Sequence, residues 1–228
     1  MNPLIAAATP ATEPGGGART APGLGSDPPA APSRRVLVLS PQPFYEDRGT
    51  PIALRQLLEA LSSLAYEVDV VVYPVGAPLD IPGVRFHRGR NPLGIRHVRV
   101  GLSLRKLVLN AGLVPVLRQR LREADYLCIH ALEEGAFLAA LLGSRRKVPI
   151  VYDMASSLPE QLRAHRGFRN RVAQAVLVGC ERWLLRRADF VVSSAGLLDR
   201  IRRLAPDTRT REWRFSGFDR DAAPGEAE

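Results

Sequence analysis

The 228-residue sequence has few lysines, cysteines and histidines, and each scarcity excludes a class of protein. Lys106 and Lys147 are the only lysines, so arginine supplies nearly all of the formal net charge of +9. The two cysteines, Cys128 and Cys180, lie among apolar residues, and their spacing fits neither a disulfide framework nor a metal site. The four histidines form no Ser/His/Asp or Cys/His set. The sequence therefore predicts no bound metal and no hydrolase-type nucleophile.

Long apolar runs are also missing. No stretch approaches the ~18 uncharged apolar residues that a membrane-spanning helix needs. Residues 1–33 are mostly Ala, Pro, Gly, Ser and Thr, which bury too little apolar surface to offset the entropy of ordering, so we expect a disordered leader. This leader lacks the basic region and apolar core of a secretory signal, so a cytoplasmic location is the simplest expectation.

From Arg34 onward, apolar β-branched runs alternate with segments of helical period. The expected strands are residues 34–40, 68–74, 84–87, 125–130, 148–154, 189–194 and 211–215. The expected helices are residues 50–67, 103–124, 133–143, 158–164, 169–188 and 195–205, with a kink or break near Gly112–Pro115. The alternation predicts an α/β fold with a doubly wound, mainly parallel, Rossmann-like sheet of six or seven strands. We expect the domain to span 34–215 and a tail to follow over 216–228.

In such sheets, ligands bind in the crevice beyond the carboxyl ends of the strands. After the first strand come Arg48, Gly49 and Thr50, at the start of a helix. A glycine there lets backbone N–H groups approach a phosphate or sugar, and Arg48 could add a charge-assisted bond. A turn glycine followed by a helix cap explains the same residues without a ligand. No G-x-G-x-x-G or Walker A sequence is present, so the sequence predicts no nicotinamide, flavin or other cofactor.

Two further strand ends carry polar residues. His130 is expected to end its strand at the crevice, where it could bind a hydroxyl or pyrophosphate, or simply a backbone carbonyl. Glu133 and Glu134 open the next helix, where the helix dipole favours acids whatever their function. The other histidines are expected to be surface or structural residues: His87, His97 and His165.

Asp153, Ser156 and Ser157 follow the strand expected at 148–154, and they suit a hydroxyl-rich ligand. Ser157 also stands three residues before Glu160, which is the spacing of a capping box. The two interpretations are compatible.

Between Ile81 and Arg122 the sequence has ten basic residues and no acid. Such a run suits an anionic membrane surface or a phosphorylated partner, and a plain solvated face explains it as well. Nonspecific DNA binding through the arginines is possible, but no helix-turn-helix motif or stacking platform supports it.

Four segments together resemble the family 4 retaining glycosyltransferases. The first is RVLVLSPQPFYEDRGTPIALRQLLEALSSLAYEVDVVVY, and the others are YLCIHALEEGAF, VPIVYDMASSLPEQL and ERWLLRRADFVVSSAGLLDRI. The resemblance covers Arg34 to about Leu204. It implies one half of a GT-B fold, in which an N-terminal domain holds the acceptor and a C-terminal domain holds a nucleotide-sugar. It further implies metal-independent transfer with retention, and attachment to the inner membrane surface through a basic patch, expected at Arg96, Arg99, Arg105 and Lys106.

The sequence departs from this family in two residues and in length. The branch it resembles has histidines where this chain has Leu132 and Ala155, and the histidine at 155 is the one expected to contact the reacting sugars. The chain stops shortly after WRFSGFD, about where the linker to the donor domain should begin. We therefore carry forward two hypotheses. One is a transferase half that needs a separately encoded donor domain and is inactive alone, and the other is a non-catalytic binding or scaffolding domain derived from a transferase.

Overall fold

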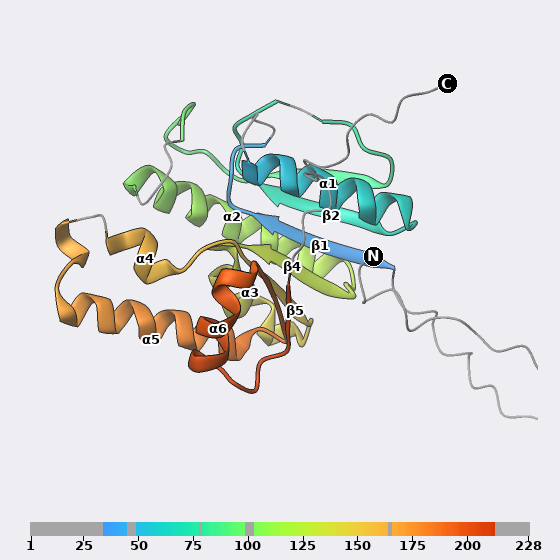
Figure 1. The fold of residues 1–228 in the computed structure, drawn as a ribbon. Coiled ribbons are helices and arrows are strands. Elements are labelled where there is room, and N and C mark those ends of the chain that lie inside the picture. The colour runs from blue at the N-terminus through green and yellow to red at the C-terminus, as the bar shows by residue number, and fades with distance from the viewer. Residues whose placement is uncertain (1–33, 45–48, 78, 99–102, 164–165, 213–228) are drawn as a thin grey trace, which may run out of the picture. The chain divides into compact units, whose positions relative to one another are not determined.

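A computed structural model describes residues 34–44, 49–77, 79–98, 103–163 and 166–212, all of which belong to one compact unit, Pro32–Glu228. Seven parallel strands form one sheet in the order β3-β2-β1-β4-β5-β6-β7 (Figure 1). The strands are β1 (Arg35–Ser40), β2 (Glu67–Val72), β3 (Val84–Arg88), β4 (Cys128–Leu132), β5 (Ile150–Met154), β6 (Phe190–Ser193) and β7 (Thr210–Glu212). The α/β prediction is confirmed, with seven strands that are all parallel.

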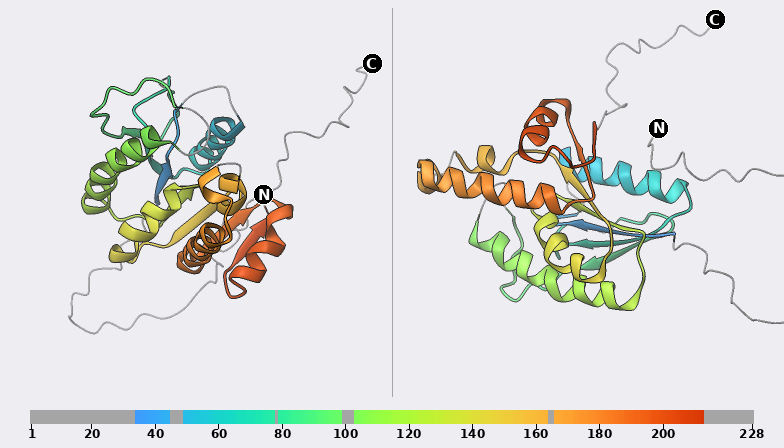
Figure 2. Two further views of the ribbon diagram at one scale, coloured as in Figure 1. Left: turned by 90° about the vertical axis from the view of Figure 1, so that its left-hand side faces the viewer. Right: turned by 90° about the horizontal axis from the view of Figure 1, so that it is seen from below.

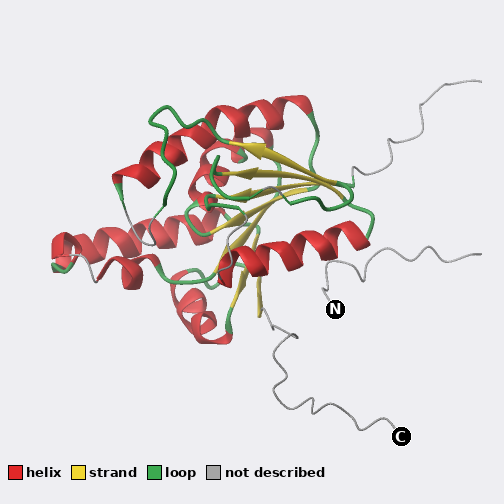
Figure 3. Ribbon diagram, turned by 90° about the horizontal axis from the view of Figure 1, so that it is seen from above, coloured by secondary structure: helices red, strands yellow, loops and turns green. Residues whose placement is uncertain are grey.

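Helices flank both faces of this sheet (Figure 3). They are α1 (Gly49–Ser63), α2 (Leu104–Glu123), α3 (Gly135–Leu142), α4 (Leu158–Arg163), α5 (Arg171–Arg187) and α6 (Ala195–Leu204), with 3₁₀ turns η2 (Ser144–Arg146) and η3 (Arg166–Phe168). The apolar side chains of α1 pack on one face, and those of α2, α3, α5 and α6 pack on the other. In Figure 2, α1 and α2 lie on opposite sides of the strands.

The central strands form because their β-branched and leucine side chains are buried on both faces of the sheet. In β1, Leu37 and Leu39 point into the core on the α2 side, whereas Val36 and Val38 point into the core on the α1 side. All four side chains are at most 4% exposed. The short continuous apolar runs in the sequence therefore correspond to strands that are buried on both faces, as predicted.

Several element bounds differ from the sequence-based expectation, and the differences at Pro115 and at the end of β4 have a clear physical reason. Helix α2 runs unbroken through Pro115. Proline removes the N–H that would bond to Ala111, but Ala111 is exposed, so water can bond its carbonyl instead. Leu109, Leu113 and Leu117 meanwhile hold the helix on the sheet. Strand β4 extends to Leu132 because Leu132 pairs with Asp153 of β5, so it ends two residues later than expected.

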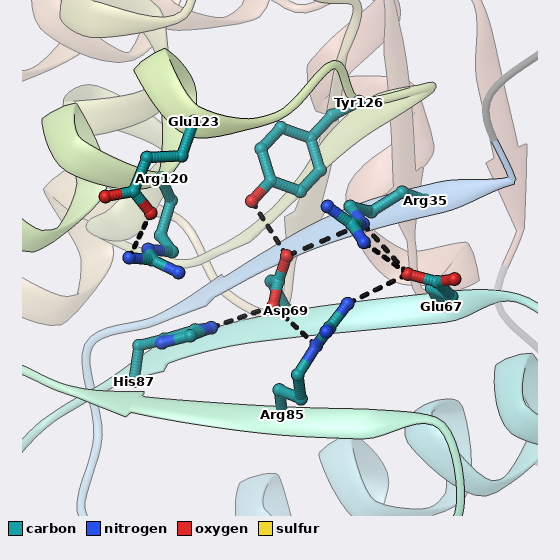
Figure 4. A network of polar contacts seen from close by, with 8 residues as sticks. All are labelled: Arg35, Glu67, Asp69, Arg85, His87, Arg120, Glu123 and Tyr126. Atoms are coloured by element: carbon teal, nitrogen blue, oxygen red, sulfur yellow. Dashed lines mark hydrogen bonds and ion pairs between the residues drawn. The ribbon is translucent and has the colours of Figure 1, made fainter.

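A charged network stands at the amino end of the sheet, on the α2 side (Figure 4). Its centre is Asp69 of β2, which is 3% exposed. His87 Nε2 and Tyr126 Oη each donate to its carboxylate at 2.8 Å, and Arg85 Nε lies 3.4 Å away. Arg35 approaches it from β1, at 3.9 Å. The network ties β1, β2 and β3 to Tyr126, two residues before β4.

The electrostatics of Asp69 follow from this set of partners. Burial opposes its negative charge, but hydrogen bonds from His87 and Tyr126 and the charges of His87 and Arg85 outweigh burial and lower its pKa. Burial and the bond to Asp69 conversely raise the pKa of the Tyr126 hydroxyl. His87, which the sequence suggested to be a surface or structural residue, is thus a structural partner of a buried carboxylate.

Candidate functional site

The strand order reverses between β1 and β4. The chain continues from β1 to β2 on one side and reaches β4 on the other side only after β3 and α2. In open parallel sheets the crevice at this switch point, beyond the carboxyl ends of the strands, is where ligands bind. Ser40 ends β1, and Leu132 ends β4 beside it.

Polar side chains from three strands share one side of the sheet at this point. Ser40, His130 and Asp153 alternate with residues of the α2-side core, which places them on the α1 side. His130 Nε2 lies 3.6 Å from Asp153 Oδ2, and its side chain is 10% exposed. His130 is the central residue of β4 and does not end the strand as expected, because β4 extends to Leu132.

Most of the buried polar side-chain atoms that make no hydrogen bond in the described residues lie in this region. Among the described residues, Ser40 Oγ, Gln42 Nε2, His130 Nε2 and Ser157 Oγ are buried and make no hydrogen bond. Ser40 and His130 lie in β1 and β4, and Gln42 and Ser157 lie in the loops that follow β1 and β5. A buried polar group without a hydrogen bond costs about 1–3 kcal/mol, so its recurrence at one place favours a ligand that supplies the missing bonds.

Ser157 does not form the capping box that its spacing suggested. Its hydroxyl makes no hydrogen bond, and the N–H of Leu158 at the start of α4 instead donates to Glu181 Oε1 of α5 at 3.0 Å. Glu181 is 2% exposed and also accepts two bonds from Arg200, at 2.8 and 2.6 Å. Because Glu181 caps α4, the Ser157 hydroxyl remains available at the strand end.

Glu133 and Glu134 lie in the turn between β4 and α3 and do not open the helix as expected, because β4 extends to Leu132 and α3 begins at Gly135. Glu133 has a left-handed backbone conformation, with φ of 45°, which is uncommon for a residue with a side chain. Lys106 of α2 forms an ion pair with Glu134. Burial and the charge of Glu134 raise the pKa of Glu133 to about 7, against the opposing charge of Lys106 and with a smaller contribution from Asp153. A carboxyl group that titrates near neutrality can either donate a hydrogen bond to a hydroxyl or accept one from it.

The remaining predicted site residues are only partly described. Arg48 and Arg99 lie outside the described residues, as does His165. Gly49 begins α1, as expected of a glycine at a helix start. Ser156 accepts a hydrogen bond from Gln161 Nε2.

The residues of the predicted basic patch have two different environments. Arg96 and Arg105 are exposed. Lys106 is only 15% exposed and points to Glu134. Three leucines accompany the arginines at the surface: Leu93 (67% exposed), Leu104 (82%) and Leu107 (53%). The surface at the start of α2 therefore combines positive charge with exposed apolar side chains, a combination that the basic run alone does not reveal.

Ser40 and Gln42 were missed by reasoning from the sequence. Ser40 closes the apolar run of β1 and appeared there as a strand residue, and Gln42 appeared as part of a loop. The available signal was the same one that identified Asp153, namely a polar residue at the carboxyl end of a buried strand.

The described residues contain neither a helix that could span a membrane nor a cluster of metal-binding side chains. No described helix is long and apolar enough to cross a bilayer. No three His, Cys, Asp or Glu side chains in the described ranges lie close enough together to hold a metal ion.

Solved structures with a similar fold include a sucrose-phosphate synthase from Thermosynechococcus elongatus and a UGT transferase from Siraitia grosvenorii in complex with UDP. The synthase gives a TM-score of 0.59 at 18% identity, over 78% of this chain and 47% of its own. The UGT transferase gives 0.50 at 11% identity, over 78% and 50%. At these identities the likeness shows the fold alone. This chain spans about half the length of either protein.

No curated protein sequence matches this chain. A family model does match, and it describes a glycosyl transferase 4-like domain over residues 48–211. The match covers most of the chain and includes α1, β4 with His130, the turn with Glu133, and β5 with Asp153, whereas β1 lies before it. The chain belongs to the glycosyl transferase 4-like family.

Proposed function

We propose that this domain is the acceptor-binding half of a retaining GT-B glycosyltransferase. In this proposal a second domain binds the nucleotide-sugar, and the pair transfers a sugar to the acceptor without a metal ion. The observation that carries the proposal is the set of buried polar atoms without a hydrogen bond in β1, β4 and the loops after β1 and β5, namely those of Ser40, Gln42, His130 and Ser157. A sugar offers many hydroxyl groups, each able to donate and accept, and so it can satisfy several such atoms at once.

The arrangement assigns roles within this proposal. His130, Asp153 and Ser157 bind acceptor hydroxyls, and Glu133 holds or releases a proton near neutral pH beside the Lys106–Glu134 pair. Arg48, Gly49, Thr50 and Ser156 belong to the same predicted site. Gly49 at the start of α1 can present backbone N–H groups to a phosphate of the donor.

Sugar binding by the isolated chain tests the acceptor site. Ligand-observed NMR with a panel of mono- and oligosaccharides is expected to detect saturable binding. His130→Ala should weaken that binding about tenfold, because one hydrogen bond to a buried group is lost. The matched control is His97→Ala, at an exposed histidine in the loop between β3 and α2. Equal binding by both variants, or none by the wild-type chain, would contradict the proposed site.

Sugar transfer tests the need for a second domain. We expect no transfer by the chain alone, and transfer when it is combined with the nucleotide-sugar-binding half of a family 4 enzyme. Full activity of the chain alone would show that no second domain is required.

Leu132 and Ala155 favour a second candidate, a non-catalytic binding domain. At these two positions the family resemblance leads us to expect histidine. Leu132 is instead 3% exposed and packs in the core with the leucines of α1, and Ala155 offers no polar group. If the domain has lost catalysis, sugars should still bind, but no combination with a donor domain, even with Ala155→His, should restore transfer.

We also propose that the start of α2 attaches the protein to an anionic membrane surface on the cytoplasmic side. Arg96 and Arg105 supply the charge, and Leu104 and Leu107 supply apolar surface that can enter the headgroup region.

The chain is expected to co-sediment with vesicles that contain phosphatidylglycerol but not with pure phosphatidylcholine. Leu104→Glu should reduce binding about tenfold, and Leu64→Glu, at a leucine outside this surface, should not. Equal binding to both kinds of vesicle would exclude the electrostatic part of the proposal.

A further inference from the structure

The outer side of α5 is apolar although it faces solvent. Val172 is 75% exposed, Val176 is 59% exposed and Trp183 is 36% exposed, and Gly179 is exposed between them. These four residues, called the α5 face below, follow each other at intervals of four, three and four. Leucines elsewhere on the helix are buried, at positions 177, 184 and 185. Apolar residues that repeat every 3.5 residues form the contact line of a helix that packs along another helix.

Gly179 leaves a depression in the α5 face. A Cβ atom added there would meet no atom within 4 Å. One turn further along, the ring of Trp183 stacks against Phe137 of α3, with centroids 6.3 Å apart, and the guanidinium of Arg187 lies 5.3 Å from the ring centroid. The ring is thus held in place on one side of the depression, and Val176 stands on the other. A bulky side chain of a neighbouring helix can enter between them.

The charge around the α5 face has one sign. Helix α5 carries four exposed arginines: Arg171, Arg182, Arg186 and Arg187. Its single acid, Glu181, is buried and paired with Arg200. Two copies of α5 packed together would therefore bring arginines against arginines. A helix with carboxylates beside its apolar residues is complementary to the α5 face both in charge and in apolar surface.

We propose that the α5 face binds an acidic amphipathic helix of a partner protein. A leucine-like side chain enters the depression at Gly179, and carboxylates flank it near Arg182 and Arg186. The outward side chains of Val172 and Val176 are short, so they would reach little depth in a bilayer, but they let a second helix axis approach to about 8–10 Å. This surface is separate from the sugar site, so the inference holds whether or not the domain binds sugar.

The test uses Trp183 as the reporter in the full chain. The other tryptophan, Trp213, is replaced by phenylalanine so that the fluorescence comes from Trp183 alone. The probe is a synthetic three-heptad peptide with leucine at the core positions and glutamate at the flanking positions. We expect a saturable blue shift, because the peptide covers the indole ring. The same peptide with lysine in place of glutamate should cause none.

Four variants test whether the peptide binds to the α5 face and not to another surface. Val176→Glu and Arg186→Glu should each weaken peptide binding at least about tenfold, by placing a negative charge against the peptide. Leu104→Glu, on α2, and Arg203→Glu, on α6, are exposed matched controls that should bind the peptide like the wild-type chain. Circular dichroism verifies that each variant is folded.

Three outcomes would overturn the inference. If phosphatidylglycerol vesicles shift the Trp183 emission and the peptide does not, the α5 face is a membrane surface. If sedimentation shows a dimer that Val176→Glu dissociates, the occupant is a second copy. If neither the peptide nor the vesicles change the emission, the face is merely solvated.

Discussion

Replacing Asp69 with alanine is expected to lower the free energy of unfolding by about 3 kcal/mol, as measured by urea denaturation at neutral pH. The carboxylate is 3% exposed and accepts hydrogen bonds from His87 and Tyr126 (Figure 4). Without it, the Tyr126 hydroxyl loses its partner in a buried position, and the nearby cations lose their counter-charge. Arg85 is 56% exposed and can be hydrated, which limits the loss.

Glu67 provides the matched control, two residues earlier on the same strand. It pairs with Arg35 and Arg85 but is 57% exposed, so the free energy of unfolding of Glu67→Ala should be close to that of the wild-type chain. An equal loss in the two variants would mean that burial does not decide the strength of this network.

The effect of Asp69 should depend on pH. Because its pKa is lower in the folded chain than in the unfolded chain, its contribution is present above the unfolded value of about 3.9 and is lost as the pH falls through the folded value. The difference in stability between the wild-type chain and Asp69→Ala should therefore shrink below about pH 4. A difference that stayed constant would show that the charge of Asp69 is not what stabilises the fold.

The second large effect is expected at Gly112, in the middle of α2. A Cβ atom there would lie 2.1 Å from the carbonyl oxygen of Arg90, whose own N–H donates to Gly112 O at 2.9 Å. Backbone cannot move aside as a side chain can, so Gly112→Ala must push the loop after β3 away from the helix. We expect a loss of about 2–3 kcal/mol in the free energy of unfolding.

Gly179 of α5 is the matched control for this substitution. A Cβ atom there meets nothing, so Gly179→Ala should gain up to about 1 kcal/mol from helix propensity alone. The two variants are thus expected to shift the urea midpoint in opposite directions. A gain at Gly112 would contradict the close packing of the loop on α2.

The fold could be predicted because its strands are short, apolar and β-branched, and because the helices between them have clear periods. Such runs form strands because they are buried, and the apolar residues that become buried can be recognised in the local sequence. A break at Pro115 does not occur, because the penalty of a proline in a helix depends on whether the carbonyl that it leaves unbonded can reach water, which is a property of the folded surface. The end of β4 was misjudged because it is set by pairing with β5.

The candidate site was predicted less completely, for a related reason. His130 and Asp153 were identified because polar residues at strand ends stand out in a sequence. Ser40 and Gln42 gain their significance only when β1 is placed beside β4. Lys106 was assigned to the basic surface by its neighbours in the sequence, yet its charge is balanced by Glu134, 28 residues away. Contacts between distant elements carry no signal in a single sequence.

The network around Asp69 and the candidate site lie at opposite ends of the same sheet, and this separation bears on how the sequence of the domain can change in evolution. If these loops bind an acceptor as proposed, substitutions after β1, β4 and β5 change which hydroxyl groups are recognised without disturbing the charges around Asp69. A stable end that tolerates little change leaves the other end free to diversify. Under the proposed function, such a scaffold acquires new acceptors by loop substitutions alone.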